Sequence, residues 1–352
     1  MNAKAKKDVR ALSKDGLRAF FTARGEPAFR GNQVFEWLWK KGAHTFEEMT
    51  NLSQGLRNDL ESEFSINHIQ VDRMQRSQDG TIKNAVRLYD GMLVESVLIP
   101  TETRTTACVS SQVGCSLNCS FCATARLKRM RNLNPDEIYD QVLIIDRQSR
   151  LYYDRPLSNI VFMGMGEPLM NYPNVMKAIE KITSESGLGL SPKRITVSTS
   201  GIPKMIRKMA DEHPKFKLAV SLHSAVDDTR TAIMPFNANF PLNDLRDAIQ
   251  YWYSKTQNRV TYEYIVWQGI NDKETDIQAL VQFCKTAPCK VNLISYNSIG
   301  DSQFRQAPPE ILNRYVQALE NARITVTIRK SRGQDIDAAC GQLANKSNSP
   351  QA

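Results

Sequence analysis

Long hydrophobic runs are absent from this sequence. No apolar stretch approaches the roughly 20 residues that a membrane-spanning helix requires, so no membrane span is expected. The basic start, residues 1–10, is not followed by an apolar stretch and therefore does not resemble a signal peptide. Internal repeats are also absent, and the polar tail, residues 344–352, is the only low-complexity segment. We therefore expect a cytoplasmic protein without membrane contact.

Cysteine is scarce, and its distribution is uneven. The chain has seven cysteines in 352 residues, an odd number, and three of them fall within eight residues. In a cytoplasmic protein such clustering favours metal or redox chemistry over a scaffold of disulfides. Cys284 and Cys289 lie apart from the cluster, and we interpret them as core or surface thiols.

Acidic residues are outnumbered by basic ones. The chain has 46 Lys and Arg against 37 Asp and Glu, which gives a formal net charge of +9. A basic balance of this size is compatible with a polyanionic partner such as RNA. Many basic proteins bind no nucleic acid, so charge alone does not identify the partner.

The length suits one large catalytic domain with a smaller accessory domain. Within residues 1–70, Leu52, Leu56 and Leu60 recur every four residues, which indicates a helix. Within residues 71–103, two Asp-Gly pairs are hairpin turn signals between strand-like runs. We therefore predict a small helical domain over residues 1–70 and a hairpin linker over residues 71–103.

Residues 104–343 alternate between strand-like and helix-like segments. Apolar residues at helical spacing predict helices over 242–255 and 310–321. The strand-like runs lie at 105–110, 159–163, 194–198, 217–222, 260–266, 290–296 and 324–328. This alternation indicates an α/β fold with a parallel sheet and right-handed crossovers, either open or closed into a barrel. The active site of such a fold is expected at the carboxyl ends of the strands.

Cys115, Cys119 and Cys122 are spaced four and three residues apart, in the loop after the first predicted strand of the barrel. Three cysteines ligate three irons of a cubane cluster and leave the fourth iron to the amino and carboxylate groups of S-adenosylmethionine (SAM). An electron from the cluster then cleaves the sulfonium and yields a 5′-deoxyadenosyl radical. The main alternative is structural zinc, which normally takes four ligands, and no fourth Cys or His lies nearby. The spacing therefore favours a [4Fe-4S] cluster with SAM.

Small and polar residues end several of the predicted strands. Glycines after the second strand allow a ligand to approach closely, and Glu167 beside them is a candidate acceptor for the SAM amino group. The candidate SAM contacts are Gly166, Glu167, Ser198, Ser221, Leu222, His223 and Asn297. Each signal is weak alone, since a glycine-rich strand end is commonly a tight turn and His223 also fits an ordinary core histidine. Together they outline one pocket.

Two further cysteines lie outside the triplet. Cys108 is on the first predicted strand of the barrel, and Cys340 lies near the C-terminus, between Gly333 and Gly341. The flanking glycines predict a mobile loop with an accessible thiol, although a lone late cysteine is usually inert.

Four sequence runs carry a family resemblance. They read CVSSQVGC (108–115), GMGEPLMN (164–171), SLH (221–223) and RGQDIDAACG (332–341). These runs closely resemble the RNA adenine C2-methyltransferases of the RlmN type, which belong with the Cfr methyltransferases among the radical SAM enzymes. The resemblance extends from about residue 25 to 343, and residues 29–56 resemble the family's accessory RNA-binding domain. It implies a partial (βα)6 radical SAM barrel over residues 104–343 with a small N-terminal helical accessory domain.

The resemblance implies a mechanism with two SAM molecules, because C2 of adenine is electrophilic and offers no nucleophile to a sulfonium. One SAM methylates Cys340, and the radical from the second removes a hydrogen from that S-methyl group, so that the methylene adds to C2. Cys108 then removes the C2 proton and attacks Cys340, and the transient disulfide releases methylated RNA. Glu95 occupies the position of the family's proton-accepting carboxylate.

The family's substrates are an adenosine in the peptidyl-transferase centre of 23S rRNA and the adenosine beside the anticodon of certain tRNAs. The resemblance implies these partners here, together with an electron donor such as flavodoxin or ferredoxin. Phosphates dominate RNA affinity, and Lys128, Arg129 and Arg131, after the cluster loop, are candidates to hold the backbone. The target base must be extruded from its stack or lie in unfolded RNA.

The sequence departs from the family pattern at a few positions and leaves other functions open. Ala125 and Lys128 replace two glycines that often follow the third cysteine, and Ser298 replaces a proline. Val113 favours C2 chemistry, because Cfr has cysteine at this position. The alternatives are a Cfr-like C8 methyltransferase of 23S rRNA, a radical SAM enzyme with an unrelated substrate, and a zinc-stabilised RNA-binding module without activity.

Overall fold

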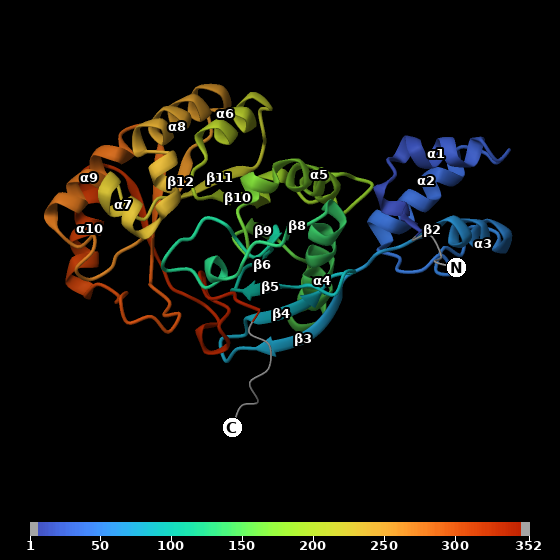
Figure 1. Cartoon of the computed structure of the whole chain (residues 1–352), viewed down its shortest axis with the longest axis horizontal. Helices are drawn as coiled ribbons and strands as arrows, with labels where there is room; N and C mark the ends of the chain where they lie inside the picture. The colour runs from blue at the N-terminus through green and yellow to red at the C-terminus, as the bar shows by residue number, and fades with distance from the viewer. Residues whose placement is uncertain (1–5, 346–352) are drawn as a thin grey trace.

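A computed structural model describes residues 6–345, so most of the tail predicted at 344–352 lies outside the described residues. The chain forms a small helical unit at one end of the molecule and a larger α/β unit beside it (Figure 1). The helical unit contains α1 (Lys14–Thr22), α2 (Phe29–Glu36) and α3 (Gln54–Glu63), and it is closed by the parallel pair β1 (Lys7–Asp8) and β2 (Phe64–Ser65). No helix within residues 6–345 is both long and apolar enough to cross a membrane.

One sheet of ten strands organises the larger unit, in the order β14-β13-β12-β11-β10-β9-β6-β5-β4-β3. Seven neighbouring strands are parallel, and each follows its neighbour along the chain. They are β6 (Thr105–Cys108), β9 (Asn159–Phe162), β10 (Ile195–Thr199), β11 (Lys217–Ser221), β12 (Val260–Ile265), β13 (Cys289–Ile294) and β14 (Thr325–Arg329). The predicted parallel α/β barrel is therefore confirmed, as a partial barrel.

Helices lie between the parallel strands and cover the outer face of the sheet (Figure 1). The principal ones are α4 (Pro135–Tyr153), α5 (Tyr172–Thr183), α6 (Pro203–Asp211), α7 (Asp227–Ile233), α8 (Leu242–Thr256), α9 (Glu274–Cys284) and α10 (Pro309–Asn321). The helices predicted over 242–255 and 310–321 are α8 and α10. In α8, Leu245, Ile249 and Trp252 share one face and are fully buried, which explains the helical spacing of these apolar residues.

The barrel strands pack their outer side chains against the helices and keep polar side chains inside. In β12, Tyr262 and Tyr264 lie against aromatic rings of α9 and α10, with ring centroids 5.4 and 5.6 Å apart. Thr261, next to Tyr262, points into the barrel instead. Because side chains alternate along a strand, the six residues of β12 supply both the outer face against the helices and the inner face of the barrel.

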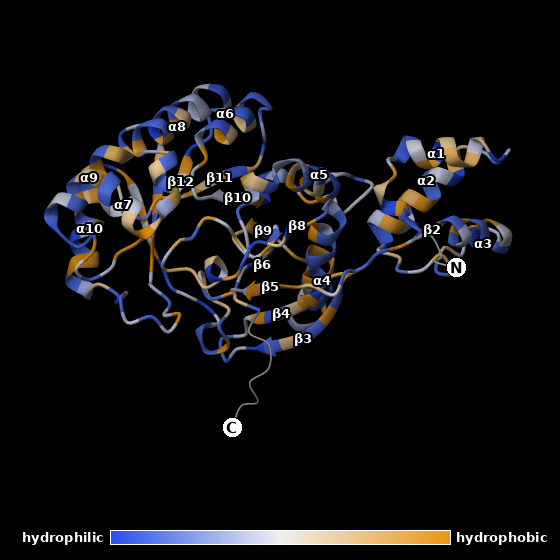
Figure 2. Ribbon diagram, viewed as in Figure 1, coloured by the Kyte–Doolittle hydropathy of each residue, from blue (hydrophilic) through white to orange (hydrophobic). Residues whose placement is uncertain are grey.

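Residues 71–103, predicted as a hairpin linker, extend the main sheet. β3 (Gln70–Arg76), β4 (Ile82–Arg87) and β5 (Leu93–Pro100) run antiparallel, and β5 pairs with β6 of the barrel. Val94 and Val97 of β5 are fully buried, whereas β3 is the exposed edge strand. Figure 2 shows this contrast, with β5 mostly hydrophobic and β3 mostly hydrophilic. The segment belongs to the sheet because β5 contributes to the shared core.

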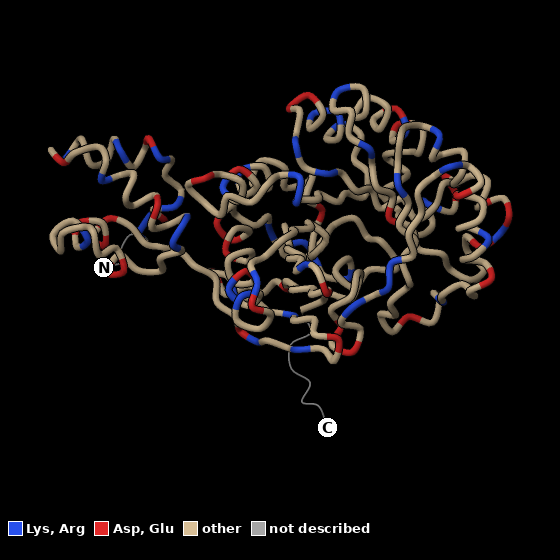
Figure 3. Tube along the Cα trace, turned by 180° about the vertical axis from the view of Figure 1, so that it is seen from behind, with Lys and Arg blue, Asp and Glu red and all other residues tan. Residues whose placement is uncertain are grey.

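The helical unit is fixed to α4. Arg10 is 8% exposed, and its Nη1 donates to both carboxylate oxygens of Asp140 at 2.8 and 2.9 Å, while Nη2 donates to Asp136 at 3.2 Å. The ring of Trp39 lies edge-on to Tyr139, with centroids 5.2 Å apart. A two-pronged ion pair is directional, so these contacts orient the helical unit relative to the barrel. Charged residues of both signs occur over both units (Figure 3).

Candidate active site

The clustered cysteines lie in a loop that a short antiparallel pair closes at its base, β7 (Gln112–Val113) with β8 (Arg131–Asn132). Gly114 opens the loop with φ +72°, and a Cβ there would lie 2.4 Å from the carbonyl oxygen of Lys128. Glycine is therefore required at this position. At the far end of the loop, the Ala123 N–H donates to the Gly341 carbonyl at 2.7 Å. The cluster loop thus contacts the C-terminal segment directly.

Cys115, Cys119 and Cys122 line one cavity of about 150 Å³, which we call the cluster cavity. Burial raises the pKa of all three thiols, to about 11 for Cys115, and negative charge on neighbouring thiols adds to the rise. Iron binds the thiolate form and so removes this penalty. Three soft donors around one cavity fit a cluster that keeps one iron open for SAM. Among residues 6–345, no three His, Cys, Asp or Glu side chains are arranged to hold a single metal ion.

Gly166 and Glu167, in the turn after β9, line the cluster cavity. The Glu167 side chain is fixed by backbone N–H groups, from Leu169 to Oε1 at 3.0 Å and from Ser200 to Oε2 at 2.8 Å. Burial raises the pKa of Glu167, which is only 2% exposed, and these N–H groups oppose the rise. Each carboxylate oxygen has a second lone pair, so Glu167 can still accept from an ammonium group.

Ser198, Ser221 and His223 line the same cavity at the ends of β10 and β11. Nδ1 of His223 accepts from the Ile265 N–H at 3.2 Å, so the proton of the neutral ring is on Nε2. Burial and the positive charge of Arg230 lower the pKa of His223 to about 3. The imidazole is therefore neutral near pH 7 and offers one N–H to a ligand.

Leu222 is placed differently from its neighbours. Its side chain is fully buried and lines neither this cavity nor the larger one described below. Its carbonyl accepts from Arg230 Nε at 3.1 Å, and Arg230 also donates to the Ser200 carbonyl at 2.6 Å. Arg230 is fully buried and ties the ends of β10 and β11 together, a role that the sequence patterns do not reveal.

Cys340 lies on the C-terminal loop, residues 333–345, which follows β14. Asn297 lines the cluster cavity, donates to the Cys340 carbonyl at 3.1 Å and accepts from Gln334 at 2.7 Å. Gly341 has φ +84° and so serves a turn that other residues rarely adopt. The glycines predict a mobile loop, whereas the structure uses them for backbone geometry and ties the loop to the barrel.

Glu95 of β5 holds the same loop from another side. It is 1% exposed and pairs with Lys83 of β4, at 3.3 Å from Nζ to Oε1. Oε2 of Glu95 accepts from the Ala344 N–H at 2.9 Å, and Lys83 donates to the Asp337 carbonyl at 3.3 Å. Glu95 lines neither cavity. In this structure its carboxylate contacts the loop that carries Cys340.

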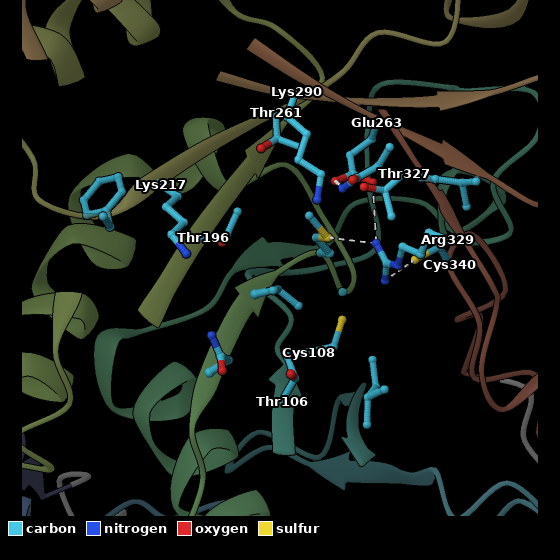
Figure 4. A pocket seen from close by; sticks show the side chains of 18 of the residues that line it. Thr106, Cys108, Thr196, Lys217, Thr261, Glu263, Lys290, Thr327, Arg329 and Cys340 are labelled. Atoms are coloured by element: carbon cyan, nitrogen blue, oxygen red, sulfur yellow. Dashed lines mark hydrogen bonds and ion pairs between the residues drawn. The ribbon is translucent and has the colours of Figure 1, made fainter. Parts of the chain in front are cut away.

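A larger cavity, of about 1090 Å³, lies on the other side of Cys340, inside the barrel (Figure 4). We call it the barrel cavity. Cys108 of β6 lines it, and Cys340 lines both cavities. Burial, with negative charge on Cys340, raises the pKa of Cys108 to about 12. Cys108 is therefore a neutral thiol at rest, facing the same space as Cys340.

Arg329, at the end of β14, is a site residue that the sequence reasoning does not single out. Its Nη2 lies 3.5 Å from Cys340 Sγ, and its Nη1 lies 3.5 Å from Glu263 Oε2 (Figure 4). Asn292 donates to the other oxygen of Glu263 at 2.8 Å. The available signal is charge at inward positions of otherwise apolar strands, as at Glu263 in β12.

Of the three basic residues after the cluster loop that are predicted to hold RNA, one is paired with acids and two are exposed. Arg131 is paired with Glu137 at 2.7 Å and with Asp90 at 2.6 Å. Lys128 and Arg129 are exposed. Arg131 therefore has a structural role beside α4.

A partial α/β barrel with three cysteines in the loop after its first parallel strand defines a radical SAM enzyme. Comparison with known proteins agrees, since residues 109–281 match the Radical SAM superfamily. A crystal structure of a radical SAM methyltransferase from Sphaerobacter thermophilus aligns with a TM-score of 0.90 and 39% identity, over 96% of this chain and 99% of that chain.

The chain belongs to the RlmN family of RNA methyltransferases. Residues 7–66 match the ribosomal RNA large subunit methyltransferase N-terminal domain. The probable dual-specificity RNA methyltransferase RlmN of Flavobacterium johnsoniae is 70% identical over 341 residues, 97% of this chain and 98% of that protein. The corresponding enzyme of Geobacter sulfurreducens is 42% identical, over 96% of this chain and 92% of that protein. This protein is therefore a SAM-dependent RNA methyltransferase with a [4Fe-4S] cluster, and the zinc-stabilised module and the unrelated substrate are set aside.

Proposed function

We propose that this enzyme methylates C2 of an adenosine in the peptidyl-transferase centre of 23S rRNA and of the adenosine beside the anticodon of tRNA, with Cys340 as methyl carrier. The position of Cys340, in the wall shared by the two cavities, supports this most strongly. A carrier thiol has to receive a methyl group on one side and meet the base on the other. Apart from Cys122 of the triplet, Cys340 is the only cysteine of the described residues that lines both cavities.

In this proposal Cys115, Cys119 and Cys122 hold the cluster, and SAM lies against the strand ends beside it. When bound, these groups supply an activated methyl group and a radical that removes hydrogen. Glu167 accepts from the amino group of SAM, and the Nε2–H of His223 donates to an acceptor of the cofactor. The further SAM contacts are Gly166, Ser198, Ser221, Asn297 and the backbone of Leu222.

Arg329 contacts the sulfur that carries the methyl group and also acts on Cys108. Its guanidinium lies 3.5 Å from Cys340 Sγ and orients the sulfur that accepts the methyl group. The same positive charge lowers the pKa of Cys108, against burial and against negative charge on Cys340. A methylated Cys340 sulfur carries no negative charge, so one factor that raises the pKa of Cys108 disappears, while burial still raises this pKa and Arg329 still lowers it. Loading of Cys340 therefore makes Cys108 easier to ionise.

Release of the product uses these two sulfurs and the loss of one electron. With the base joined to the Cys340 methylene, the adduct carries one unpaired electron, which would pass to the cluster as Cys108 removes the C2 proton. Cys108 then gives up this proton, and its sulfur attacks the Cys340 sulfur. The S–S bond forms as the C–S bond breaks, and the released carbon takes a proton to become the methyl group. An external thiol reduces the disulfide, and a flavodoxin or ferredoxin supplies the electron for the radical step, which places the reaction in the cytoplasm.

The test is a Cys108→Ala variant expressed together with RNA. We expect it to retain RNA covalently on Cys340, and digestion should give a linkage at C2 of adenine. A linkage at C8 would assign Cfr-like chemistry instead, and RNA that remains free would contradict the proposal. Cys284→Ala, which removes a buried cysteine outside both cavities, should release RNA like the wild type.

A further inference from the structure

The interior of the barrel is hollow, and both polar and apolar side chains line it. In closed α/β barrels this space is filled by layers of Val, Ile and Leu. Here threonines from four different strands take part in the lining: Thr106, Thr196, Thr261 and Thr327. Asn159 and Asn292 add amide groups at other strands. Walls of this kind leave hydrogen-bonding groups available to a polar occupant along the whole barrel cavity.

Several cations line this cavity near the amino-terminal ends of the strands. We call four of them the basic rim: Arg104, Lys217, Arg259 and Lys290. Lys193, Lys215 and Lys255 line the same end. Lys217 is the first residue of β11, and Lys290 is the second residue of β13. The side chains of both lysines reach into the cavity (Figure 4). In the described part of the chain, no member of the rim forms an ion pair with an acid.

The charges of the rim act on one another. Burial lowers the pKa of Lys290, and the positive charges of Arg259, Arg104 and Lys217 lower it further, while Glu263 opposes them. Like charges held together without acidic partners are costly, and an anion bound among them removes the cost. The rim therefore has the character of a phosphate site.

The rim and the reactive thiols share one continuous cavity, because Cys108 and Cys340 line its inner end. Its volume of about 1090 Å³ is slightly larger than the range of about 300–1,000 Å³ for small-molecule sites, so a nucleotide fits. The cluster cavity is assigned to the cluster and SAM, so the barrel cavity is the space left for the base of the RNA. Lys128 and Arg129, the cations suggested by sequence, line neither cavity.

We propose that the RNA substrate docks on the basic rim and inserts its target adenosine into the barrel from the amino-terminal ends of the strands. The phosphates that flank the extruded nucleotide lie against Arg104, Lys217, Arg259 and Lys290, and its base reaches Cys340 through the barrel cavity. Phosphate contacts set the register of the RNA, while the inner wall receives the base. This inference rests on the proposed function, since it takes Cys340 as the group that meets the base.

The experiment compares two charge-matched double variants. Lys217→Gln/Lys290→Gln removes two rim charges, and Lys128→Gln/Arg129→Gln removes two exposed charges after the cluster loop. Binding of a short RNA with an unpaired target adenosine is measured over a range of salt concentrations. We expect the slope of log K against log salt to become shallower by about 0.7 for each lost phosphate contact, about 1.4 for the rim variant. The loop variant should keep the wild-type slope, and Lys217→Arg/Lys290→Arg should restore it.

Transfer of a methyl group from SAM to Cys340 without RNA, followed by intact mass, separates docking from chemistry. We expect it to be unchanged in both double variants. If unmethylated wild-type Cys340 takes no methyl group, the proposed function fails whatever the binding data show. An unchanged slope in the rim variant, or a loss confined to the loop variant, overturns the docking proposal. Pyrophosphate is the separate probe for a free anion, and rim binding of pyrophosphate that RNA does not displace also overturns it.

Discussion

The cluster cavity and the barrel cavity meet at Cys340, yet they are built in opposite ways. The cluster cavity is small and takes most of its polar lining from strand ends and the loops after them, where Glu167 and His223 are held by backbone N–H groups. The barrel cavity is several times larger and takes its lining from alternate residues of many strands. Side chains fixed by backbone hydrogen bonds suit a cofactor that must be oriented, whereas a large interior suits a substrate that enters and leaves.

The largest expected effect is the loss of methylation at the cluster cavity while RNA binding at the barrel cavity is retained. Cys119→Ser removes one of the three cysteine sulfurs, so we expect loss of the iron cluster and of all measurable RNA methylation. RNA affinity should stay within about twofold of wild type, because the rim is untouched. Iron content and visible absorbance measure the cluster, and RNA binding measures the basic rim, all in one preparation. Cys284→Ser is the matched control, and a parallel loss of RNA binding in Cys119→Ser would show that the cavities do not act independently.

The next effect concerns Glu95, which holds the loop that carries Cys340. Glu95→Gln leaves the buried Lys83 without its charge partner, at a cost of about 3 kcal/mol in the free energy of unfolding. Denaturant unfolding measures this cost. The double variant Lys83→Met/Glu95→Met removes both charges and should recover most of the stability. Glu95→Gln as stable as wild type would contradict the anchoring role of this pair.

A smaller effect is expected at the thiol that both cavities share. Arg329→Gln removes the charged contacts with Cys340 and with Glu263. One charge-assisted contact is worth about 1.5–3 kcal/mol, which corresponds to about 10- to 100-fold slower methylation of Cys340. Arg329→Lys keeps the positive charge and should lose less of the rate. Mass spectrometry of Cys340 over time gives the rate. Lys330→Gln, a neighbouring exposed cation, should behave as wild type, and an equal defect in Arg329→Lys would contradict a role of the charge.

The effect that is smallest near neutral pH is a pH dependence confined to the cluster cavity. The pKa of His223 is about 3 in the folded protein and near 6.5 when unfolded, so the unfolded chain binds the proton more readily between these values. The stability that His223 contributes is present above about pH 6.5 and is lost as pH falls toward 3, by up to about 1.4 kcal/mol per unit. His223→Gln should flatten this part of the stability curve, measured by denaturant unfolding at several pH values. Exposed His213→Gln should not.

The sequence alone predicts much of the fold and one of the two cavities. All seven predicted strands of the barrel are present, because strand runs that alternate with helices of regular spacing leave few other arrangements. Cys115, Glu167 and His223 lie apart in sequence but line one cavity, since parallel strands bring their carboxyl ends to the same edge. Leu222 shows the limit of this reasoning, because a residue within a matching run turns its side chain into the core.

The barrel cavity could not be predicted in the same way. Its residues occur one or two at a time in strands that are otherwise apolar, as Lys290 and Asn292 do in β13. Whether these residues meet in one cavity depends on the register of neighbouring strands, which pairs Thr261 with Lys290 and Glu263 with Asn292. Local spacing carries no such information. The place of residues 71–103 in the main sheet could not be predicted either, because a hairpin turn signal does not indicate which other strand the hairpin will pair with.

The contact between Glu95 and the Ala344 N–H joins residues 249 positions apart. During synthesis the barrel strands leave the ribosome long before Ala344 does, so most of the sheet can form while this end of the chain is still missing. The anchor of Cys340 is therefore among the last contacts that translation permits. A chain that stopped before Ala344 would have a complete cluster loop and the contact of Asn297 with Cys340, but not the contact of Glu95 that holds the far end of the same loop.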